Sequence, residues 1–521
     1  MKKWYYAVGG ICVAIAAVLL ILWAAPFQTE KMAGVGSVSP VSSADSVTPG
    51  NPANPTSPTN PVSPASSTDP ESSPGSCAEG CEKYDVVVIG SEIQGVLLAR
   101  EARNNGLQVL ILDPRSKPGG ELTLAQMQFL DEPNDKNKHS LVQGDIKPLF
   151  DGYKRGKIRT AAEFDRYYNK MAEGIPMESG IVIQSVATND VQQGKTLTTL
   201  TYQTPDATIH KIQANYWVEN TDFAALTGKL GVKRIPGMES LYNVADHEPD
   251  YMAATLMLKF KKVNWSRLHQ AVLEDYPLTN VVEKYGPNTY VDWNIATGFS
   301  NILSNYKPQD SQLVLRGMNT VDQKHGEAIM NALLIYGVDP ADPESVQEAI
   351  RKGEEEAPFV LEFLRKNIPG FEKAELNGFP EYLYIRDYNR YETEYVLQYD
   401  DVKDGHMFWD NVSIGGYSID LQGTKKIPKG IGYGKTDRYG MPLRSFELKD
   451  YDNVLVVGKN VGASIKAYGS ARIMPNTALA AQTIGIILGR EHDKRLKELT
   501  PDDFKRIYDY LQKDYDIVLN H

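Results

Sequence analysis

Two glycines and two carboxylates near residue 100 have the spacing of a dinucleotide-binding turn. Gly90 and Gly95 stand at the first and third glycine positions of the pattern G-x-G-x-x-G, and Glu92 occupies the second. Asp113 follows about 20 residues later, where an acidic side chain accepts hydrogen bonds from a ribose. Free N–H groups at the start of the next helix would hold a pyrophosphate. The segment predicts a dinucleotide site, although the carboxylate of Glu92 stands where phosphates approach the backbone.

The elements that position these residues can be recognised on either side of the turn. Residues 86–89 form an apolar run typical of a strand buried on both faces, and residues 96–103 have a helical pattern. Residues 108–112 form a second apolar run, which ends at Asp113. This order of strand, helix and strand favours a dinucleotide site over the alternative, an ordinary tight turn in a doubly wound sheet.

The rest of the sheet can be followed along the chain. Residues 181–183 and 216–218 are predicted to form its third and fourth strands, and residues 196–213 a β-hairpin around Thr204-Pro205-Asp206. Residues 454–457 form a fifth apolar run far along the chain. Flavin-binding folds complete their sheet with a strand from late in the chain, as this run would do.

Two features favour FAD over a nicotinamide cofactor. The fingerprint occurs once, because the glycine-rich residues 430–434 follow no buried strand and are predicted to form a loop. After Gly458, residues 474–476 open an apolar helix over 477–488, whose positive end can face the isoalloxazine ring and stabilise the reduced flavin. The alternative is an ordinary amphipathic C-terminal helix.

Two late segments carry the most specific motifs. Residues 453–460 read NVLVVGKN and residues 469–475 read GSARIMP, which is similar to NLLVAGRNIS…GSVRVMP in the bacterial FAD-dependent oxidoreductases with a glutathione-reductase-like flavin fold. Residues 219–228 are similar to the family's ATGDGDLAALAG, with Glu-Asn-Thr in place of Ala-Thr-Gly. The resemblance extends from Tyr84 to Arg490 and implies the family's fold and cofactor.

The resemblance also covers Asp113-Pro114-Arg115 and Gly119-Gly120, and it implies that residues in the two late segments lie near the flavin or its phosphates. No histidine or cysteine lies between Asp113 and Asp131, so we expect noncovalent FAD. The cofactor-binding residues predicted in this way are Gly90, Glu92, Gly95, Asp113, Arg115, Gly119, Gly120, Gly458, Asn460, Arg472 and Met474.

Arg386, Tyr388 and Arg390 are the candidates for orienting an anionic or polyhydroxylated substrate, because the planar guanidinium suits carboxylates. Arginines that form surface or interdomain ion pairs are the alternative. His406, near Trp409 in a polar loop, is a candidate base or else a structural residue. We expect a small-molecule or carbohydrate-like substrate. The electron acceptor stays open among oxygen, a quinone and an exported carrier.

Composition narrows the classes of function. The formal net charge of −11 argues against nucleic acid as a partner. No cysteine follows Cys81, which excludes a dithiol flavoenzyme and cysteine-ligated metal sites in the main body, and no metal site is predicted. Cys77 and Cys81 either form a disulfide or remain free thiols. The sequence has no G-x-S-x-G elbow and no H-E-x-x-H motif, so hydrolase chemistry has little support.

Residues 1–28 are predicted to be a single transmembrane anchor, or else a cleaved signal. Lys2 and Lys3 precede an uncharged run that is long enough to span a membrane, which places the N-terminus inside and the rest outside. Residues 29–81, rich in Pro, Ser and Thr, are predicted to be a disordered linker. We therefore expect the catalytic body outside the cytoplasm, tethered to the cell membrane or secreted after cleavage.

The predicted fold class is α/β. A discontinuous Rossmann-like FAD-binding domain is expected over 82–232 and 447–495, an inserted α+β substrate or cap domain over 233–446, and a C-terminal helix within 496–521. The predicted function is hydride transfer from an unidentified organic substrate to FAD. One alternative is a non-catalytic cell-surface binding protein that retains the flavin fold. Another is an amine or amino-acid oxidase.

Overall fold

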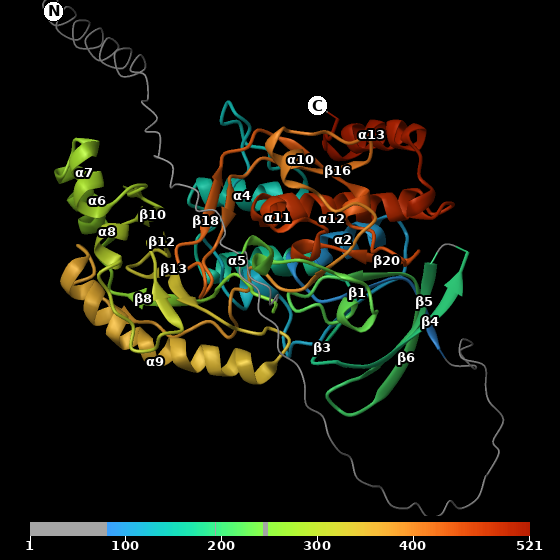
Figure 1. The fold of residues 1–521 in the computed structure, drawn as a ribbon, viewed down its shortest axis with the longest axis horizontal. Coiled ribbons are helices and arrows are strands. Elements are labelled where there is room, and N and C mark those ends of the chain that lie inside the picture. The colour runs from blue at the N-terminus through green and yellow to red at the C-terminus, as the bar shows by residue number, and fades with distance from the viewer. Residues whose placement is uncertain (1–80, 193, 243–247, 521) are drawn as a thin grey trace, which may run out of the picture. The chain divides into compact units, whose positions relative to one another are not determined.

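The computed structural model of the protein describes residues 81–192, 194–242 and 248–520 (Figure 1). The predicted anchor, and all of the predicted linker except its last residue, lie outside this part of the chain. No helix in the described part is both long and apolar enough to cross a membrane. Cys81 is disulfide-bonded, and the other two cysteines lie outside the described residues.

A mainly parallel sheet forms the first half of the fold. Its parallel strands are β3 (Met177–Ser179), β2 (Val109–Asp113), β1 (Glu82–Ile89), β6 (Ile209–Glu219) and β20 (Val454–Val456), which lie side by side in that order. The last four residues of β1 are fully buried, as expected of a strand covered on both faces. The predicted β-α-β unit and the late strand are therefore confirmed.

The antiparallel part of this sheet differs from the prediction. Residues 182–183 of the predicted third strand belong to β4 (Val182–Val191), which lies in this sheet, whereas the third strand in chain order is β3, which pairs with β2. β4 pairs with β5 (Gly194–Gln203), which pairs with β6. Val182 is 56% exposed, so the run is apolar in sequence but lies on a sheet with one open face. The predicted fourth strand and half of the predicted hairpin are one continuous strand, β6.

Two helices lie against each other over the first sheet. α2 (Ile93–Asn104) follows the first turn, and α12 (Met474–Arg490) is the predicted late helix. Gly485 permits their close approach, because a Cβ there would overlap the backbone of Leu98. α5 (Ala161–Ala172) packs beside α2 and begins with a capping box at Thr160.

A second, antiparallel sheet lies within the predicted insertion. Figure 1 shows it beside the long helix α9 (Pro343–Asn367), which contacts strands β8 (Ala254–Lys261) and β13 (Ala328–Ile335). The remaining strands are β9 (Tyr290–Val291), β10 (Ile295–Gly298), β11 (Leu313–Leu315), β12 (Met318–Asp322) and β14 (Glu375–Leu376).

The end of the predicted insertion packs on the cofactor side of the fold. β16 (Asn411–Gly415) pairs with β19 (Tyr439–Pro442) and contacts α12. The predicted glycine-rich loop contains a strand, β18 (Ile431–Gly434), because it pairs with β17 (Ile419–Leu421). The backbone pairing could not be read from a local pattern in which every second residue is glycine.

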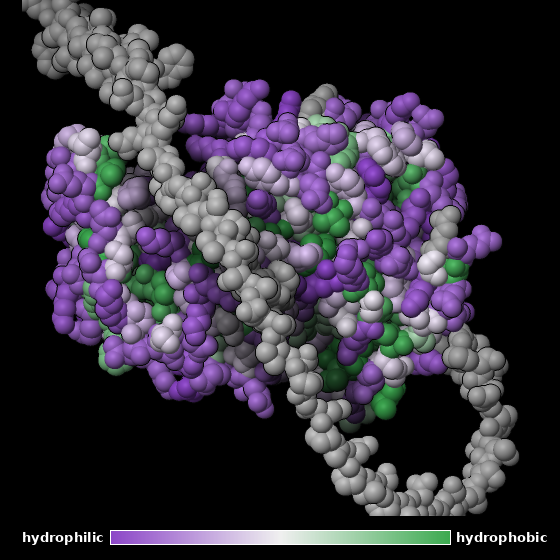
Figure 2. Space-filling model, viewed as in Figure 1, coloured by the Kyte–Doolittle hydropathy of each residue, from purple (hydrophilic) through white to green (hydrophobic). Residues whose placement is uncertain are grey.

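The remaining helices and strands lie between these elements or, for the last helix, after them. They are α3 (Gly120–Thr123), α4 (Lys147–Lys154), α6 (Trp265–Glu274), α7 (Leu278–Tyr285), α8 (Ser300–Leu303), α10 (Tyr399–Lys403), α11 (Ile465–Ala471), α13 (Pro501–Tyr515), β7 (Arg234–Ile235), β15 (Arg390–Tyr391) and 3-10 turns at Gly144–Ile146, Thr227–Lys229, Met238–Leu241, Leu443–Ser445, Gly458–Asn460 and Leu496–Glu498. Figure 2 shows a mostly hydrophilic face with hydrophobic residues in small groups, as expected when the apolar side chains fill the cores around the two sheets.

Candidate cofactor and active site

The turn that follows β1 requires glycine at its first position. Gly90 has a φ of +98°, and a Cβ there would lie 2.6 Å from the carbonyl oxygen of Asn220. The third fingerprint glycine, Gly95, donates its N–H to Asn220 Oδ1 at 2.7 Å, and a Cβ there would lie 2.8 Å from Val88 Cγ1. The two predicted glycines are therefore brought together around the end of β6.

Asp113 lies at the end of β2, fully buried, with both carboxylate oxygens engaged. Oδ2 accepts the N–H of Ser91 at 2.9 Å and its hydroxyl, and Oδ1 accepts the N–H of Arg115 at 2.8 Å. The Arg115 guanidinium binds the same carboxylate, with Nη2 to Oδ2 at 2.8 Å. Burial alone would raise the pKa of Asp113, but the charge of Arg115 and these hydrogen bonds outweigh it and hold the pKa below its usual value.

Glu92 turns its side chain toward the second glycine-rich turn. It is only 2% exposed, and its Oε1 accepts Arg115 Nη1 at 2.6 Å. Its Oε2 accepts the backbone N–H of Glu121 at 2.8 Å. Gly119 and Gly120 shape this turn with φ values of +122° and +53°, and a Cβ on Gly120 would overlap the Glu92 carboxylate. The Glu92 carboxylate therefore accepts a backbone N–H, that of Glu121, which would otherwise be free to bind a phosphate oxygen of the cofactor.

A buried lysine, Lys459 of the motif at residues 453–460, reaches toward the turn at Gly119 and Gly120. Lys459 Nζ donates to the carbonyl oxygen of Ile385 at 2.8 Å and lies 3.2 Å from Glu121 Oε2 and 3.6 Å from Asp222 Oδ2. Burial lowers the pKa of Lys459, but the two carboxylates outweigh it and raise the pKa. On either side, Gly458 has a φ of +66°, and Asn460 Nδ2 donates to the carbonyl oxygen of Thr221 at 2.6 Å.

The N-terminus of α12 borders a small internal cavity of about 20 Å³, room for about one water molecule. Met474, the first residue of α12, lines it together with Tyr384 from the other half of the chain. Asp131 adds a carboxylate, and burial raises its pKa. The other residues that line the cavity are Glu121, Met127, Phe129, Leu130, Phe150 and Ile473.

Arg472 lies beside this cavity, two residues before α12. Its Nη1 is 3.5 Å from the Tyr384 hydroxyl and its Nη2 is 3.4 Å from the carbonyl oxygen of Asp420. The side chain is 7% exposed, and its Nε has no hydrogen-bond partner among the described residues. The Nε of Arg316 also lacks one within the part of the chain that the structure describes. We call Arg316, Arg386 and Arg472 the arginine cluster.

Arg386 lies in this cluster but is engaged by the second sheet. Its guanidinium donates to the carbonyl oxygen of Ala253 at 2.9 Å, to Thr255 Oγ1 at 2.7 Å and to Asn331 Oδ1 at 3.0 Å. Burial, together with the positive charges of Arg316 and Arg472, lowers the pKa of Arg386 to about 9. These contacts anchor the second sheet to the cofactor half.

The other predicted catalytic residues lie in different surroundings. Arg390 forms an ion pair with buried Asp387 and stacks over the ring of Tyr468 at 3.8 Å. Tyr388 packs against Tyr251, with ring centroids 4.9 Å apart. His406 is exposed, and its ring packs on Phe408 at 4.4 Å. A catalytic role for these residues stays a prediction.

Several residues of the site carried no signal of their own in the sequence. Lys459 lies between two predicted residues, Gly458 and Asn460, so the late motif could have identified it. Arg316 and Asp131 have no motif around them, because the fold brings them from distant segments to the cavity. The only signal of Asn220 in the sequence was that it belongs to the Glu-Asn-Thr segment, which departs from the Ala-Thr-Gly expected of the family.

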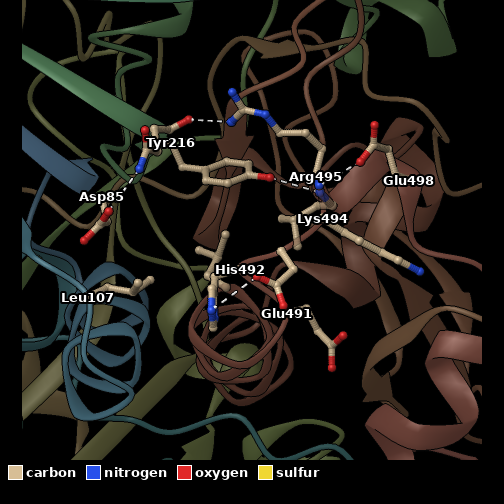
Figure 3. Close-up of a pocket in the computed structure, with 12 residues that line it drawn as sticks. Asp85, Leu107, Tyr216, Glu491, His492, Lys494, Arg495 and Glu498 are labelled. Atoms are coloured by element: carbon tan, nitrogen blue, oxygen red, sulfur yellow. Dashed lines mark hydrogen bonds and ion pairs between the residues drawn. The ribbon is translucent and has the colours of Figure 1, made fainter.

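A larger pocket of about 350 Å³ lies at the opposite end of the parallel strands (Figure 3). Figure 3 shows Asp85 and Tyr216, from early in β1 and late in β6, facing Arg495 and His492 beyond the end of α12. The N–H of Leu496 donates to the Tyr216 hydroxyl at 2.9 Å. Ligands of such sheets bind at the carboxyl ends of the strands, so this pocket is separate from the cradle around Gly90.

A family model described as FAD dependent oxidoreductase matches residues 85–508. The chain belongs to this family. Its enzymes use FAD, and FAD is the cofactor indicated for this oxidoreductase.

Solved structures to which this oxidoreductase is similar have low identity to it and low TM-scores. A geranylgeranyl bacteriochlorophyll reductase-like protein from Thermoplasma acidophilum is 11% identical, with a TM-score of 0.37 over 84% of this chain and 85% of that one. A flavoprotein/dehydrogenase from Cytophaga hutchinsonii is 10% identical, with a TM-score of 0.36 over 83% and 84%. The p-nitrophenol 4-monooxygenase of Pseudomonas putida DLL-E4 is 11% identical, with a TM-score of 0.34 over 83% and 90%.

The backbone of this oxidoreductase fits FAD. The glycine turn, the N-terminus of α2 and the buried acid at the end of β2 are the parts that hold the ADP half of a dinucleotide. The amide of Glu121 is a further donor for phosphate, and Met474 places a helix N-terminus beside the internal cavity. Bound FAD supplies a two-electron acceptor. One side chain departs from the pattern, because Glu92 already occupies the Glu121 amide.

Proposed function

We propose that this oxidoreductase removes a hydride from a small carboxylate-bearing substrate bound between the N-terminus of α12 and the second sheet. The observation that supports this most directly is the buried, unpartnered Nε of Arg472 among the described residues, beside the cavity that Met474 lines. A buried donor without a partner costs free energy, so a site that leaves one open favours a ligand with an acceptor.

The charges around the cavity support an anionic substrate. The arginine cluster contributes three positive charges. Asp131, Asp420 and Glu121 contribute three carboxylates, of which Glu121 is already paired with Lys459. Burial lowers the pKa of Arg386, and the charges of Arg316 and Arg472 lower it further. A substrate carboxylate would form paired hydrogen bonds with a guanidinium of the cluster.

We assign the proton acceptor to Asp131. Oxidation of a carbinol or an amine carbon releases a hydride from carbon and a proton from oxygen or nitrogen, and leaves a C=O or C=N bond. Asp131 borders the cavity, and burial raises the pKa of its carboxyl group, which makes it a better acceptor of that proton. His406, exposed beside Phe408, has no such position.

The test is anaerobic mixing of the FAD-loaded protein with 2-hydroxycarboxylates and amino acids, and with the uncharged amides of the same compounds. The bleaching of the flavin absorbance is followed. We expect at least one carboxylate to reduce the flavin and its amide to do so far more slowly. Equal rates for acid and amide would contradict the carboxylate site. Reduction by none of these compounds would contradict the proposed substrate class.

We also propose that the body of the protein works outside the cytoplasm, tethered by residues 1–28. The sequence of that segment and the disulfide at Cys81 support this, because disulfides persist in oxidising compartments. The test is membrane fractionation with alkaline extraction, followed by protease treatment of intact cells and N-terminal sequencing. Recovery in the cytoplasmic fraction would contradict the proposal, and a new N-terminus near residue 25 would replace the anchor by a cleaved signal.

A further inference from the structure

We propose that the carboxylate of Glu92 takes the place of the FAD pyrophosphate in the cofactor-free protein and leaves the Glu121 amide when FAD binds. The proposal concerns FAD binding and does not depend on the substrate. It makes Glu92 an internal competitor of the cofactor, at the fingerprint position where the pattern has glycine.

The hydrogen bonds of Glu92 are those that a phosphate would make. Its Oε2 accepts the Glu121 N–H at 2.8 Å, and its Oε1 accepts Arg115 Nη1 at 2.6 Å. An amide and a guanidinium are the donors that phosphate groups use in proteins. The carboxylate also lies over Gly120, in space that any side chain at that position would overlap. Close backbone approach is the reason for glycine in such turns.

The charge of the cradle explains why Glu92 must move. Glu92, Asp113, Glu121 and Asp222 are buried carboxylates, and they are opposed by two cations, Arg115 and Lys459. A pyrophosphate brings further negative charge, so it cannot share the cradle with the Glu92 carboxylate at low energy. Withdrawal of that carboxylate releases one guanidinium N–H and one backbone N–H for the phosphate oxygens.

Arg115, the partner that Glu92 would leave, borders open space. Arg115 lines an open pocket of about 500 Å³ together with Leu124, Phe223 and Tyr382. The guanidinium lies 5.7 Å from the ring centroid of Tyr382, so an aromatic face accompanies it. Asp113 remains a second partner that orients Arg115 after Glu92 has left.

The experiment measures the affinity of the cofactor-free full chain for FAD and for ADP, by quenching of flavin fluorescence and by calorimetry. The variants are Glu92→Gln, which removes the charge at constant size, and Glu92→Gly, which restores the pattern. Glycine is also a favourable helix N-cap residue, so this second variant is expected to fold. The matched control is Glu101→Gln, because Glu101 is another buried carboxylate of α2, near its far end.

We expect both Glu92 variants to bind FAD and ADP roughly tenfold more tightly than the natural protein, and Glu101→Gln to bind them unchanged. Melting temperatures of the cofactor-free proteins report whether each variant folds. Weaker binding by Glu92→Gln would mean that Glu92 holds the cofactor, for example through the ribose, and would overturn the proposal. Unchanged affinity, or tighter FAD binding without tighter ADP binding, would overturn it as well.

Discussion

Asn220 Oδ1 accepts a hydrogen bond from the backbone N–H of Gly95 at 2.7 Å and so joins the end of β6 to the first turn of α2. Asn220 belongs to the Glu-Asn-Thr segment that replaces Ala-Thr-Gly of the family motif. The departure therefore has a structural role, because the side chain satisfies one of the four N–H groups that every helix N-terminus leaves free.

Replacement of Asn220 by alanine is expected to leave the Gly95 amide without its acceptor and to lower the free energy of unfolding by about 1–2 kcal/mol. FAD affinity should fall with it, since the same helix start forms the cradle. Urea unfolding and FAD titration measure the two effects. Asn215→Ala is the control, because Asn215 lies on β6 and its side-chain amide donates to the half-buried Asp85 carboxylate rather than to a helix N-terminus. Equal losses in both variants would contradict the capping role.

Gly95→Ala is expected to abolish FAD binding or folding. Its Cβ would lie 2.8 Å from Val88 Cγ1 and would overlap the Asn220 side chain, so the helix could not stay against the strand. Gly432→Ala is the control, because a Cβ there meets no atom of the described residues within 4 Å. Flavin absorbance retained after desalting measures binding. A Gly95→Ala protein that keeps its FAD would show that α2 can shift without loss of the site.

Glu219→Ala is expected to destabilise the fold by about 3 kcal/mol. The buried carboxylate accepts the N–H groups of Thr221, Leu226 and Thr227 at 2.7–3.0 Å, and all three would lose their partner. Chemical denaturation measures the loss. Glu219→Gln keeps one acceptor and should lose less, whereas equal losses for both variants would assign the effect to packing.

Glu447 is expected to make the protein less stable as the pH rises. Burial raises its pKa from 4.5 to about 7 in the folded chain, so the folded state binds more protons than the unfolded state between these values. The stability that this group contributes is complete below about pH 4.5 and is lost as the pH rises through about 7, by on the order of 3 kcal/mol. Glu447→Gln should flatten this part of the curve of melting temperature against pH.

The control for this prediction is Glu354→Gln on α9, because Glu354 is exposed. It should leave the pH dependence unchanged. A Glu447→Gln protein whose melting temperature falls between pH 5 and pH 8 as steeply as that of the natural protein would assign the slope to other groups, such as Glu101, whose pKa burial also raises to about 7.

Arg472→Gln is expected to raise the KM of a carboxylate substrate tenfold or more, because it removes a charge-assisted hydrogen bond. The uncharged amide of the substrate should be affected much less, and the rates are compared at saturating FAD because Arg472 is also a predicted cofactor-binding residue. Steady-state kinetics on the acid and amide measure this difference. Arg444→Gln is the control, since Arg444 pairs with Asp410 and does not line the cavity. An equal change for acid and amide would contradict a direct contact.

The sequence predicted the parts of the fold that depend on local spacing. The β1-α2-β2 unit, the strand at 454–456 and the helix at 474–490 follow from apolar runs and glycine turns, and the structure confirms them. Residues 182–183 do form part of a strand, but an apolar triplet does not report that this strand, β4, runs antiparallel to its neighbour and extends to residue 191. Residues 431–434 were predicted to form a loop but form a strand, because their backbone pairs with β17.

By itself, the sequence determined the family, the FAD-binding fold and the positions of the fingerprint residues, since these depend on the types and spacing of neighbouring residues. Only the tertiary structure decided that Glu92 turns onto the Glu121 amide, that Lys459 bridges Glu121 and Asp222, and that the three arginines of the cluster lie near one another. Those relationships join segments more than 20 residues apart in the chain, and in some cases hundreds. Side-chain direction and burial, which set charge and affinity there, arise only when the segments pack together.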